Sequence, residues 1–232
     1  MSIYAIGDLH LSFAQDVEKP MDIYGSVWKN HTEKLKKNWK MEIKPEDTVI
    51  LAGDISWGLR LSEAIPDLQW IDELPWKKVI FKGKHDLWGN GISKLNSLFD
   101  SISFVQNTAY EAEGCFLCGS RGWICPGHDD FTQQDEKIYK RELLRLEMSL
   151  KDAKKKGAEE IIGVLHFPPS SGNSCGSEFT DLFADYGVSQ VVYGHLHGQD
   201  AYGNGLKGYF NGVTYRLVSL DYLACKPLRI KE

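Results

Sequence analysis

The sequence has no long hydrophobic run. None of its apolar stretches approaches the roughly 18 residues that a membrane-spanning helix requires. The first residues, MSIYAIGDLHLSF, lack a positive segment followed by a long apolar run and a small-residue cleavage site, so no signal peptide is predicted. We therefore expect a soluble, cytoplasmic protein with no membrane partner.

An excess of positive charge is also absent. The chain has 27 lysines and arginines against 32 aspartates and glutamates, which gives a net charge of -5. A broad basic face for gripping nucleic acid would require the opposite balance, so nucleic acid is not favoured as a partner. Low-complexity tracts, linkers rich in proline and internal repeats are missing as well. A length of 232 residues fits one large domain or two small ones.

Cysteine is scarce and odd in number. Five cysteines leave one thiol unpaired in any complete disulfide scheme, and without an export signal reduced thiols are the simpler interpretation. Cys115 and Cys118 form a C-x-x-C pair, and with Cys125 and His128 they could hold a structural zinc ion. The surrounding residues, CFLCGS, are more typical of a buried strand in which thiols pack as small apolar groups, and we favour that interpretation.

The sequence does contain a series of short apolar runs, each ending abruptly in a polar motif. Runs of four to six residues rich in valine and isoleucine are typical of buried strands. Helical patterns lie between them, the clearest at about 133–156 and another at about 25–41. This alternation predicts an α/β architecture with helices covering the faces of a sheet. The runs are IYAI before Gly7-Asp8, TVILA before Gly53-Asp54, KVIFK before Gly83-Lys84-His85-Asp86, EIIGVL before His166 and VSQVVY before Gly194-His195.

Other segments have different patterns. Residues 103–122 predict short strands with tight connections, and residues 213–220 alternate well enough for one more strand. Three stretches predict long, glycine-rich loops, namely 120–132, 167–177 and 198–212. The last two directly follow histidine motifs, so we expect them to form walls of a functional site.

Side chains that bind metals stand where the apolar runs end. In open α/β sheets, ligands bind beyond the carboxyl ends of the strands. Asp8 and His10 are two residues apart, so both point to one side if the strand direction persists, and His195 and His197 repeat this spacing. A mixed set of carboxylates and imidazoles suits iron, manganese or zinc better than calcium. The candidate metal ligands are Asp8, His10, Asp54, His166, His195 and His197.

A single histidine at the end of a strand is more often a structural residue than a ligand. Here, five of the seven histidines in the chain lie in such motifs, and chance scatter does not place them there. The ordered series GDLH (7–10), GD (53–54), GKHD (83–86), LHFPP (165–169) and GHLH (194–197) resembles the calcineurin-like metallophosphoesterases. The motifs span nearly the whole chain, and their order makes the resemblance more specific than any one of them.

This resemblance implies a single domain over residues 1–232, built as a four-layer α/β/β/α sandwich of two mixed sheets flanked by helices. It also implies two metal ions (manganese, iron or zinc) and a phosphate-ester substrate, which a metal-bound hydroxide at the dinuclear centre would attack in line. On the family's pattern one metal would be held by Asp8, His10, Asp54 and His197, and the second by the bridging Asp54 with His166 and His195.

Two further residues receive roles from the resemblance. His85 is expected near the leaving oxygen, as a general acid or as a positive donor to it. Asp86 is expected to orient His85 through a hydrogen bond to the other ring nitrogen. Both are therefore candidate catalytic residues.

Lys84 departs from the family's pattern. The motif is normally GNHD, in which the asparagine oxygen ligates the second metal, whereas a lysine has no acceptor and normally carries a positive charge. Three interpretations are open. The second site is simply weaker, or the ammonium takes the place of the second cation and contacts the substrate phosphate, or Lys84 points away and activity is impaired.

Several residues outside the motifs are candidates for substrate recognition. Arg121 begins a glycine-containing loop and could bind a substrate phosphate through two hydrogen bonds, and a surface ion pair is an equally good interpretation. Trp57, Trp88 and Trp123 lie beyond motif strands, where one could stack on an organic leaving group, although packing is the more common role of tryptophan. His31 lies in a helix rich in lysine, and we expect it on a solvated surface.

The leading hypothesis is the hydrolysis of a phosphomonoester or phosphodiester of small to medium size. A nuclease of the same superfamily is an alternative, which the acidic net charge does not favour. A metal-binding scaffold or regulatory protein with impaired catalysis is the third, which Lys84 would suggest. The presence of His85 and Asp86 argues against it, because a scaffold has no need of them.

Overall fold

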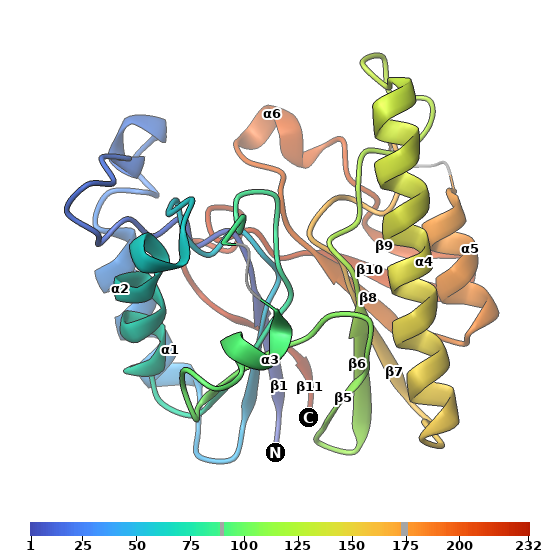
Figure 1. The fold of residues 1–232 in the computed structure, drawn as a ribbon, viewed down its shortest axis with the longest axis horizontal. Coiled ribbons are helices and arrows are strands. Elements are labelled where there is room, and N and C mark those ends of the chain that lie inside the picture. Colours follow the sequence, from blue (N-terminus) through green and yellow to red (C-terminus); the bar gives the residue numbers. More distant parts are fainter. Residues whose placement is uncertain (89–90, 173–175) are drawn as a thin grey trace.

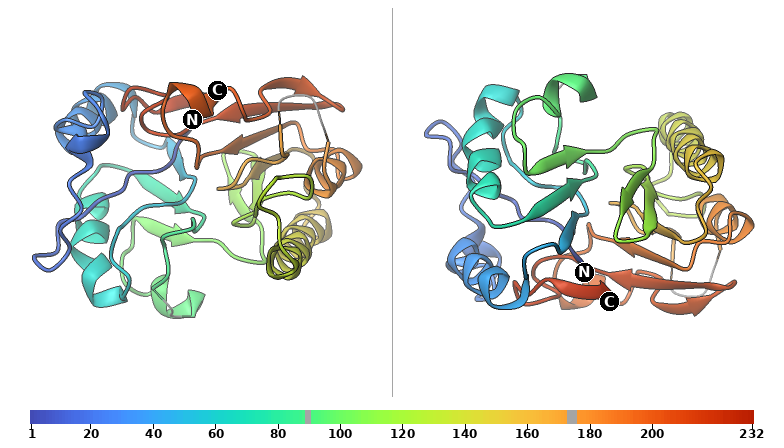
Figure 2. Two further views of the ribbon diagram at one scale, coloured as in Figure 1. Left: turned by 90° about the horizontal axis from the view of Figure 1, so that it is seen from above. Right: turned by 90° about the horizontal axis from the view of Figure 1, so that it is seen from below.

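The computed structural model describes residues 1–88, 91–172 and 176–232, and it consists of two β-sheets packed face to face with helices on both outer sides (Figure 1). Seen from above and below, the helices lie outside and the sheets face each other between them (Figure 2). This is the four-layer α/β sandwich of two mixed sheets that the sequence predicts. Cys175 and part of the loop expected at 167–177 lie outside the described residues.

The first sheet has five strands in the order β11-β1-β2-β3-β4. Three of the predicted apolar runs form its centre, where strands β1, β2, β3 and β4 pair in parallel. Strand β11 pairs with β1 in the antiparallel direction, so the sheet is mixed. The strands are β1 (Ile3–Ile6), β2 (Thr48–Leu51), β3 (Lys77–Ile80), β4 (Ile102–Phe104) and β11 (Leu228–Lys231).

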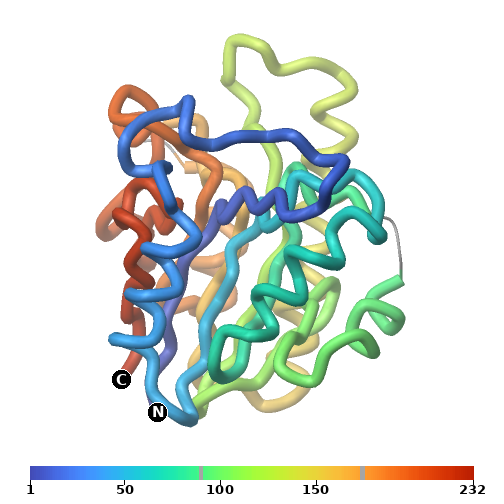
Figure 3. Tube along the Cα trace, turned by 90° about the vertical axis from the view of Figure 1, so that its left-hand side faces the viewer, coloured from blue at the N-terminus to red at the C-terminus, as the bar shows by residue number. Residues whose placement is uncertain are grey.

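The second sheet has six strands in the order β5-β6-β7-β8-β10-β9. Strands β6, β7, β8 and β10 are parallel, and β5 and β9 pair with its outer members in the antiparallel direction. The strands are β5 (Tyr110–Ala112), β6 (Cys115–Gly119), β7 (Ile161–Val164), β8 (Gln190–Tyr193), β9 (Gly208–Phe210) and β10 (Val213–Leu217). Parallel strands place their carboxyl ends at one edge, which in both sheets lies at the end of the molecule opposite the chain termini (Figure 3).

Helices cover the outer faces of both sheets. On the first sheet lie α1 (His31–Glu42), α2 (Leu61–Asp72) and α3 (Ile92–Leu95), and on the second lie α4 (Gln133–Lys155) and α5 (Glu178–Asp185). The short helices η1 (Met21–Tyr24) and α6 (Gln199–Tyr202) lie beyond the strand ends. Helix α4 begins at a capping box in which Thr132 and Asp135 bond each other's backbone N–H groups. None of the helices in the described residues is long and apolar enough to span a membrane.

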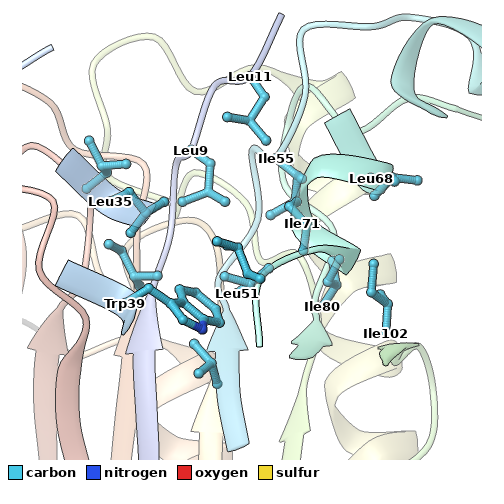
Figure 4. Close-up of a cluster of buried hydrophobic side chains, with 14 of the residues drawn as sticks. Leu9, Leu11, Leu35, Trp39, Leu51, Ile55, Leu68, Ile71, Ile80 and Ile102 are labelled. Carbon is cyan, nitrogen blue, oxygen red and sulfur yellow. The ribbon is translucent and has the colours of Figure 1, made fainter. Parts of the chain in front are cut away.

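Alternation along the strands divides the hydrophobic core into three layers. Val49 and Leu51 of β2 pack toward helices α1 and α2, whereas Ile50 between them packs toward the second sheet. The outer layer on the first sheet includes Trp39 of α1 and Ile71 of α2 (Figure 4). Because both faces of the central strands are buried, they need continuous apolar runs, which the sequence has.

The structure corrects several element boundaries. The helix expected at about 25–41 begins only at His31, because Asn30 adopts a left-handed conformation (φ 53°) that a helix does not continue. Helix α2 was not predicted, and it contains Pro66, which normally argues against a helix interior. The expected loop at 198–212 is wrong in part, since it contains α6 and the edge strand β9. The loop expected at 120–132 has no helix or strand, as predicted.

Candidate metal centre

The six candidate ligands converge at the edge where the parallel strands end. Asp8 and Asp54 follow β1 and β2 of the first sheet, and His166 and His195 follow β7 and β8 of the second. The side chains form two groups, within each of which the ligand atoms lie within 4.8 Å of one another. The first group is Asp8, His10 and His197, and the second group is Asp54, His166 and His195.

In the first group, two imidazole nitrogens face each other. Nε2 of His10 lies 3.2 Å from Nε2 of His197, which in turn lies 3.6 Å from Oδ1 of Asp8. Nδ1 of His197 faces a carboxylate oxygen of Asp221, so this nitrogen carries the proton and Nε2 presents its lone pair to the group. Two lone pairs and a carboxylate at this separation repel one another unless a cation or a proton lies between them.

The second group repeats this arrangement with different atoms. Nδ1 of His195 lies 3.2 Å from Nε2 of His166, which lies 3.3 Å from Oδ2 of Asp54. Nδ1 of His166 donates to the backbone carbonyl of Ala52 at 3.1 Å, which again leaves Nε2 as the acceptor. The donor set and its convergence therefore fit a metal ion in each group.

Backbone conformation explains how residues two apart reach one group. The prediction assumed that the strand direction persists through Asp8 and His10, and this is wrong. Both adopt left-handed conformations, with φ of 60° and 47°, and so do Asp54 (50°) and His195 (74°). Hydrogen bonds between the two loops, from Asp8 N to Gly53 O and from His10 N to Asp54 O, stabilise these unfavourable conformations.

Two glycines permit the close approach of loops to ligands. The N–H of His195 donates to both carboxylate oxygens of Asp8, at 2.9 and 3.0 Å, and a Cβ atom at Gly194 would overlap that carboxylate. A Cβ atom at Gly83 would likewise overlap the backbone and side chain of Asp54. Glycine is therefore required at both positions by space.

The charges of the site are unbalanced when no cation is present. Burial raises the pKa of Asp8 to about 6. Burial alone would lower the pKa of His166, but the carboxylates of Asp54 and Asp8 raise it to about 9. Burial lowers the pKa of His10 to about 3 and, together with the charge of His166, that of His195 to about 2. Without a cation, His166 thus takes up a proton in the place where a metal would supply the positive charge, whereas His10 and His195 stay neutral, as metal ligands must.

Asp221 is a functional residue that the sequence analysis missed. Its Oδ1 lies 3.0 Å from Nδ1 of His197, and its Oδ2 accepts the N–H of Gly198 at 3.0 Å. A carboxylate on the second ring nitrogen of a ligating histidine fixes the tautomer and the ring orientation. The sequence signal that could have identified Asp221 is its position just beyond β10, at the same edge of the sheets as the candidate ligands.

His85 lies beside the second group. Its backbone N–H donates to Oδ1 of Asp54 at 2.7 Å, and its ring nitrogen Nε2 lies 3.9 Å from Oδ2 of the same residue. The side chain is 32% exposed, so it can reach a bound molecule. The ring of Trp57 packs against it with the centroids 4.4 Å apart.

Asp86 has a different role from the one expected. Its carboxylate accepts backbone N–H groups of Gly83 at 2.7 Å, Ile55 at 2.9 Å and Ser56 at 3.4 Å, and it makes no hydrogen bond to the His85 ring. It therefore joins the loops that follow β2 and β3, while Trp57 packs on the His85 ring. Burial, and then the charge of Asp54, raise the pKa of Asp86 to about 6.

Neither of the two residues proposed for substrate binding forms a hydrogen bond or ion pair to the ligand groups through its side chain, among the residues that the structure describes. Lys84 is exposed and makes no hydrogen bond or ion pair within the described parts of the chain. Its charge contributes, after burial and other charges, to lowering the pKa values of His85 and His195, so it lies near the second group. Arg121 lies 3.4 Å from Glu142 and over the ring of Trp123.

Of the three tryptophans considered from the sequence, Trp57 belongs to the site, and Trp28, which was not considered, lines the same cavity. Trp57 lines a cavity of about 350 Å³ together with His10, His85 and His197, and its ring stacks on His10 at 4.6 Å. Trp88 is fully buried, as is usual for packing.

The structure also bears on the interpretations of His31 and of the cysteines. His31 is not on a solvated surface, because its two ring nitrogens lie 3.1 Å from the carbonyl oxygens of Trp28 and Leu9. Cys115, Cys118 and Cys225 are buried thiols. No group of potential metal ligands among the described residues contains a cysteine, which agrees with packing rather than zinc binding.

Two clusters of carboxylate and imidazole ligands at the junction of two sheets define a metal-binding site of an α/β sandwich protein. A sequence model of the calcineurin-like phosphoesterases matches residues 1–199, and the chain belongs to this family. It is accordingly a metal-dependent phosphoesterase, a hydrolase whose family takes phosphate esters as substrates and generally uses two divalent metal ions. No curated protein sequence matches the chain.

Solved structures show the same fold at low sequence identity. The protein TT1561 of Thermus thermophilus is 13% identical with a TM-score of 0.60, over 99% of this chain and 97% of that one. The phosphopantetheinyl hydrolase PptH of Mycobacterium tuberculosis is 16% identical with a TM-score of 0.51, over 99% of this chain and 95% of that one. At such identities the likeness establishes the fold alone.

Proposed function

We propose that this protein hydrolyses small or medium-sized phosphomonoesters or phosphodiesters at a centre of two metal ions, which are manganese, iron or zinc. The observation that carries the proposal is the meeting of both ligand groups with His85 at one cavity. The two ions, when bound, supply positive charge to the phosphate and lower the pKa of a water that attacks phosphorus.

Each ion is bound by one of the two ligand groups. Asp8, His10 and His197 hold the first, and Asp54, His166 and His195 hold the second. Asp54 is the proposed bridge, since its charge acts on His10 of the first group as well as on His166 of its own.

His85 is the proposed donor to the leaving oxygen. Its backbone is tied to Asp54 and its ring is packed on Trp57, so the imidazole has a defined direction beside the second group. From this position, an imidazole N–H donates a hydrogen bond or a proton to the oxygen that leaves phosphorus.

Lys84 is the proposed cause of a weaker second site. The family's asparagine would add an oxygen ligand there, and an ammonium adds none. Because the side chain is exposed and bonded to none of the residues that the structure describes, its charge is available to an oxygen of the substrate phosphate.

The first experiment measures turnover of p-nitrophenyl phosphate and of its bis ester. Protein freed of metal is reloaded separately with manganese, iron and zinc, and Asp54→Asn is measured beside it. We expect turnover of at least one ester that depends on metal and is lost in the variant. No turnover of either ester with any metal would favour the scaffold, and a strongly salt-dependent affinity for DNA would favour the nuclease.

The second experiment concerns Lys84. In Lys84→Asn we expect tighter binding of the second metal and a higher KM for the monoester, because an oxygen ligand is gained and a cation facing the phosphate is lost. Metal content per chain and steady-state kinetics measure the two effects. Equal occupancy and equal turnover would show that the substitution is inconsequential.

A further inference from the structure

A second cavity opens at the same edge of the sandwich, on the other side of the loop after β3. Its volume is about 240 Å³, and the chain just beyond β3, β4 and β6 lines it. Gly83 and Asp86 face this cavity, whereas His85 between them faces the metal centre. The loop after β3 therefore separates the two cavities and contributes residues to both.

Three guanidinium groups surround one carboxylate, and two of them line this cavity. Glu142 of α4 is fully buried, and its Oε1 lies 2.9 Å from Arg145, 3.4 Å from Arg121 and 3.6 Å from Arg141. Arg121 and Arg145 line the cavity, and Arg141 does not. The four groups carry a net positive charge, since one carboxylate neutralises only one of the three arginines.

The pairing of these groups is incomplete. Nε of Arg121 and Oε2 of Glu142 are both buried without a hydrogen-bond partner in the described chain. A buried polar atom left without a partner is destabilising, so the cluster is poorly explained as a device for stability alone. Arg121 therefore has a hydrogen-bond donor, beside the cavity, that no residue of the described chain uses.

Arg121 is tied directly to the metal centre. Its carbonyl oxygen accepts the N–H groups of His166 and Phe167, both at 3.0 Å. Its guanidinium is also close enough to Asp54 for the charge of that carboxylate to act on it. The cavity and the metal centre are thus held in a fixed relation by one short segment.

We infer that this cavity, which we call the arginine pocket (Arg121, Glu142 and Arg145), binds a second anionic group of the substrate while the ester phosphate lies at the metal centre. The inference rests on the proposed function and narrows it to phosphate esters that carry a further phosphate or carboxylate. Guanidinium groups bind both anions through paired hydrogen bonds, and Glu142 holds the guanidinium groups of Arg121 and Arg145 in place.

Two pairs of esters test the inference with metal-loaded protein. Fructose 1,6-bisphosphate is compared with fructose 6-phosphate, and 3-phosphoglycerate with glycerol 3-phosphate, so that a second phosphate and a carboxylate are tested separately. We expect a KM at least about tenfold lower for the member of one pair that carries the second anionic group, which corresponds to one bidentate contact. Arg145→Gln should reduce that preference severalfold, and Arg141→Gln, which removes a contact to the same carboxylate outside the pocket, should keep it.

Glu142→Gln provides a test with the opposite sign. Removal of the carboxylate charge leaves the cluster with more net positive charge, so the preference for the ester with a second anionic group should increase. A merely structural cluster would lose stability and gain no preference. Because the arginine variants could fail to fold, sulfate binding to the metal-free wild type is measured by thermal shift as well. We expect a concentration-dependent rise in Tm that exceeds the general stabilisation by sulfate seen in Arg145→Gln and that Arg141→Gln retains.

Equal KM values within both pairs, or no rise in Tm with sulfate, would overturn the inference that the arginine pocket binds a second anionic group. This outcome differs from failure of the proposed function, since p-nitrophenyl phosphate, which has no second anion, would still be hydrolysed. Absence of turnover of every ester would instead count against the proposed function.

Discussion

Nδ1 of His197 lies 3.0 Å from Oδ1 of Asp221, at the outer side of the first ligand group. The other oxygen of Asp221 is held by the N–H of Gly198, so the carboxylate cannot turn away. Asp221 therefore positions the ring of His197, and through it would act on a metal bound at the first group.

Asp221→Asn should weaken metal binding at the first group about 10- to 100-fold, because the histidine loses the charge that makes its Nε2 a strong ligand. Calorimetric titration with manganese measures this affinity. Asp200→Asn, at an exposed acidic residue of the neighbouring helix α6, is the matched control. Equal affinities of the two variants would contradict the role given to Asp221.

His85→Gln should lower kcat for phosphate esters about 10²- to 10⁴-fold, which is the usual loss when a general acid is removed. Metal content should stay at the wild-type level, because His85 belongs to neither ligand group. Kinetics and metal analysis on the same sample separate the two effects. A loss of metal parallel to the loss of turnover would make His85 a ligand instead.

Gly194→Ala should displace the carboxylate of Asp8, because the new methyl group overlaps it. Overpacking of this kind costs about 1–3 kcal/mol, and the first group should also lose metal affinity. Gly203→Ala is the control, since a Cβ atom there meets only Asp200 O at 3.9 Å. Urea unfolding in the presence of a chelator isolates the steric cost from the loss of metal. If Gly194→Ala were as stable as Gly203→Ala, the carboxylate of Asp8 would have moved aside without a cost in stability.

Lys78 should make unfolding depend on pH in the alkaline range. Its side chain is 1% exposed, and burial lowers its pKa to about 8. Between pH 8 and the unfolded value of about 10.4 the unfolded chain holds the proton and the folded chain does not, so the free energy of unfolding rises with pH. Below pH 8 both states are protonated and the cost of burying the charge is fully present.

Lys78→Met lacks this contribution, and comparison with it removes the effect of other titrating groups. From pH 7.5 to pH 10.5 we expect the wild type to gain about 1–3 kcal/mol relative to the variant. Urea unfolding at several pH values measures the difference. A difference that is constant over this range would show that Lys78 keeps an ordinary pKa in the folded protein.

The part of this structure that the sequence predicts well depends on repeated local patterns. The run TVIL is apolar at every position but its first because β2 is buried on both faces, and helix α4 has both an apolar stripe and a capping box. The ligands could be located because parallel strands bring their carboxyl ends to one edge.

Features that depend on non-local contacts could not be predicted. The left-handed conformation of Asp8 is imposed by hydrogen bonds to the loop after β2, which is distant in the chain. The partner of Asp86 was misjudged for the same reason, since three backbone amides from two loops compete for its carboxylate. The arginines around Glu142 come from a loop and a helix that no motif connects.

Each ligand group of the metal centre draws residues from both sheets: Asp8 and Asp54 follow strands of the first, and His166, His195 and His197 follow strands of the second. Bound ions would thus act as cross-links across the interface between the two sheets. Neither sheet holds a complete group by itself, so such a link forms only after the sheets have docked. The ions should then slow the separation of the sheets far more than they speed their association, and the benefit would be kinetic: a longer lifetime of the folded state.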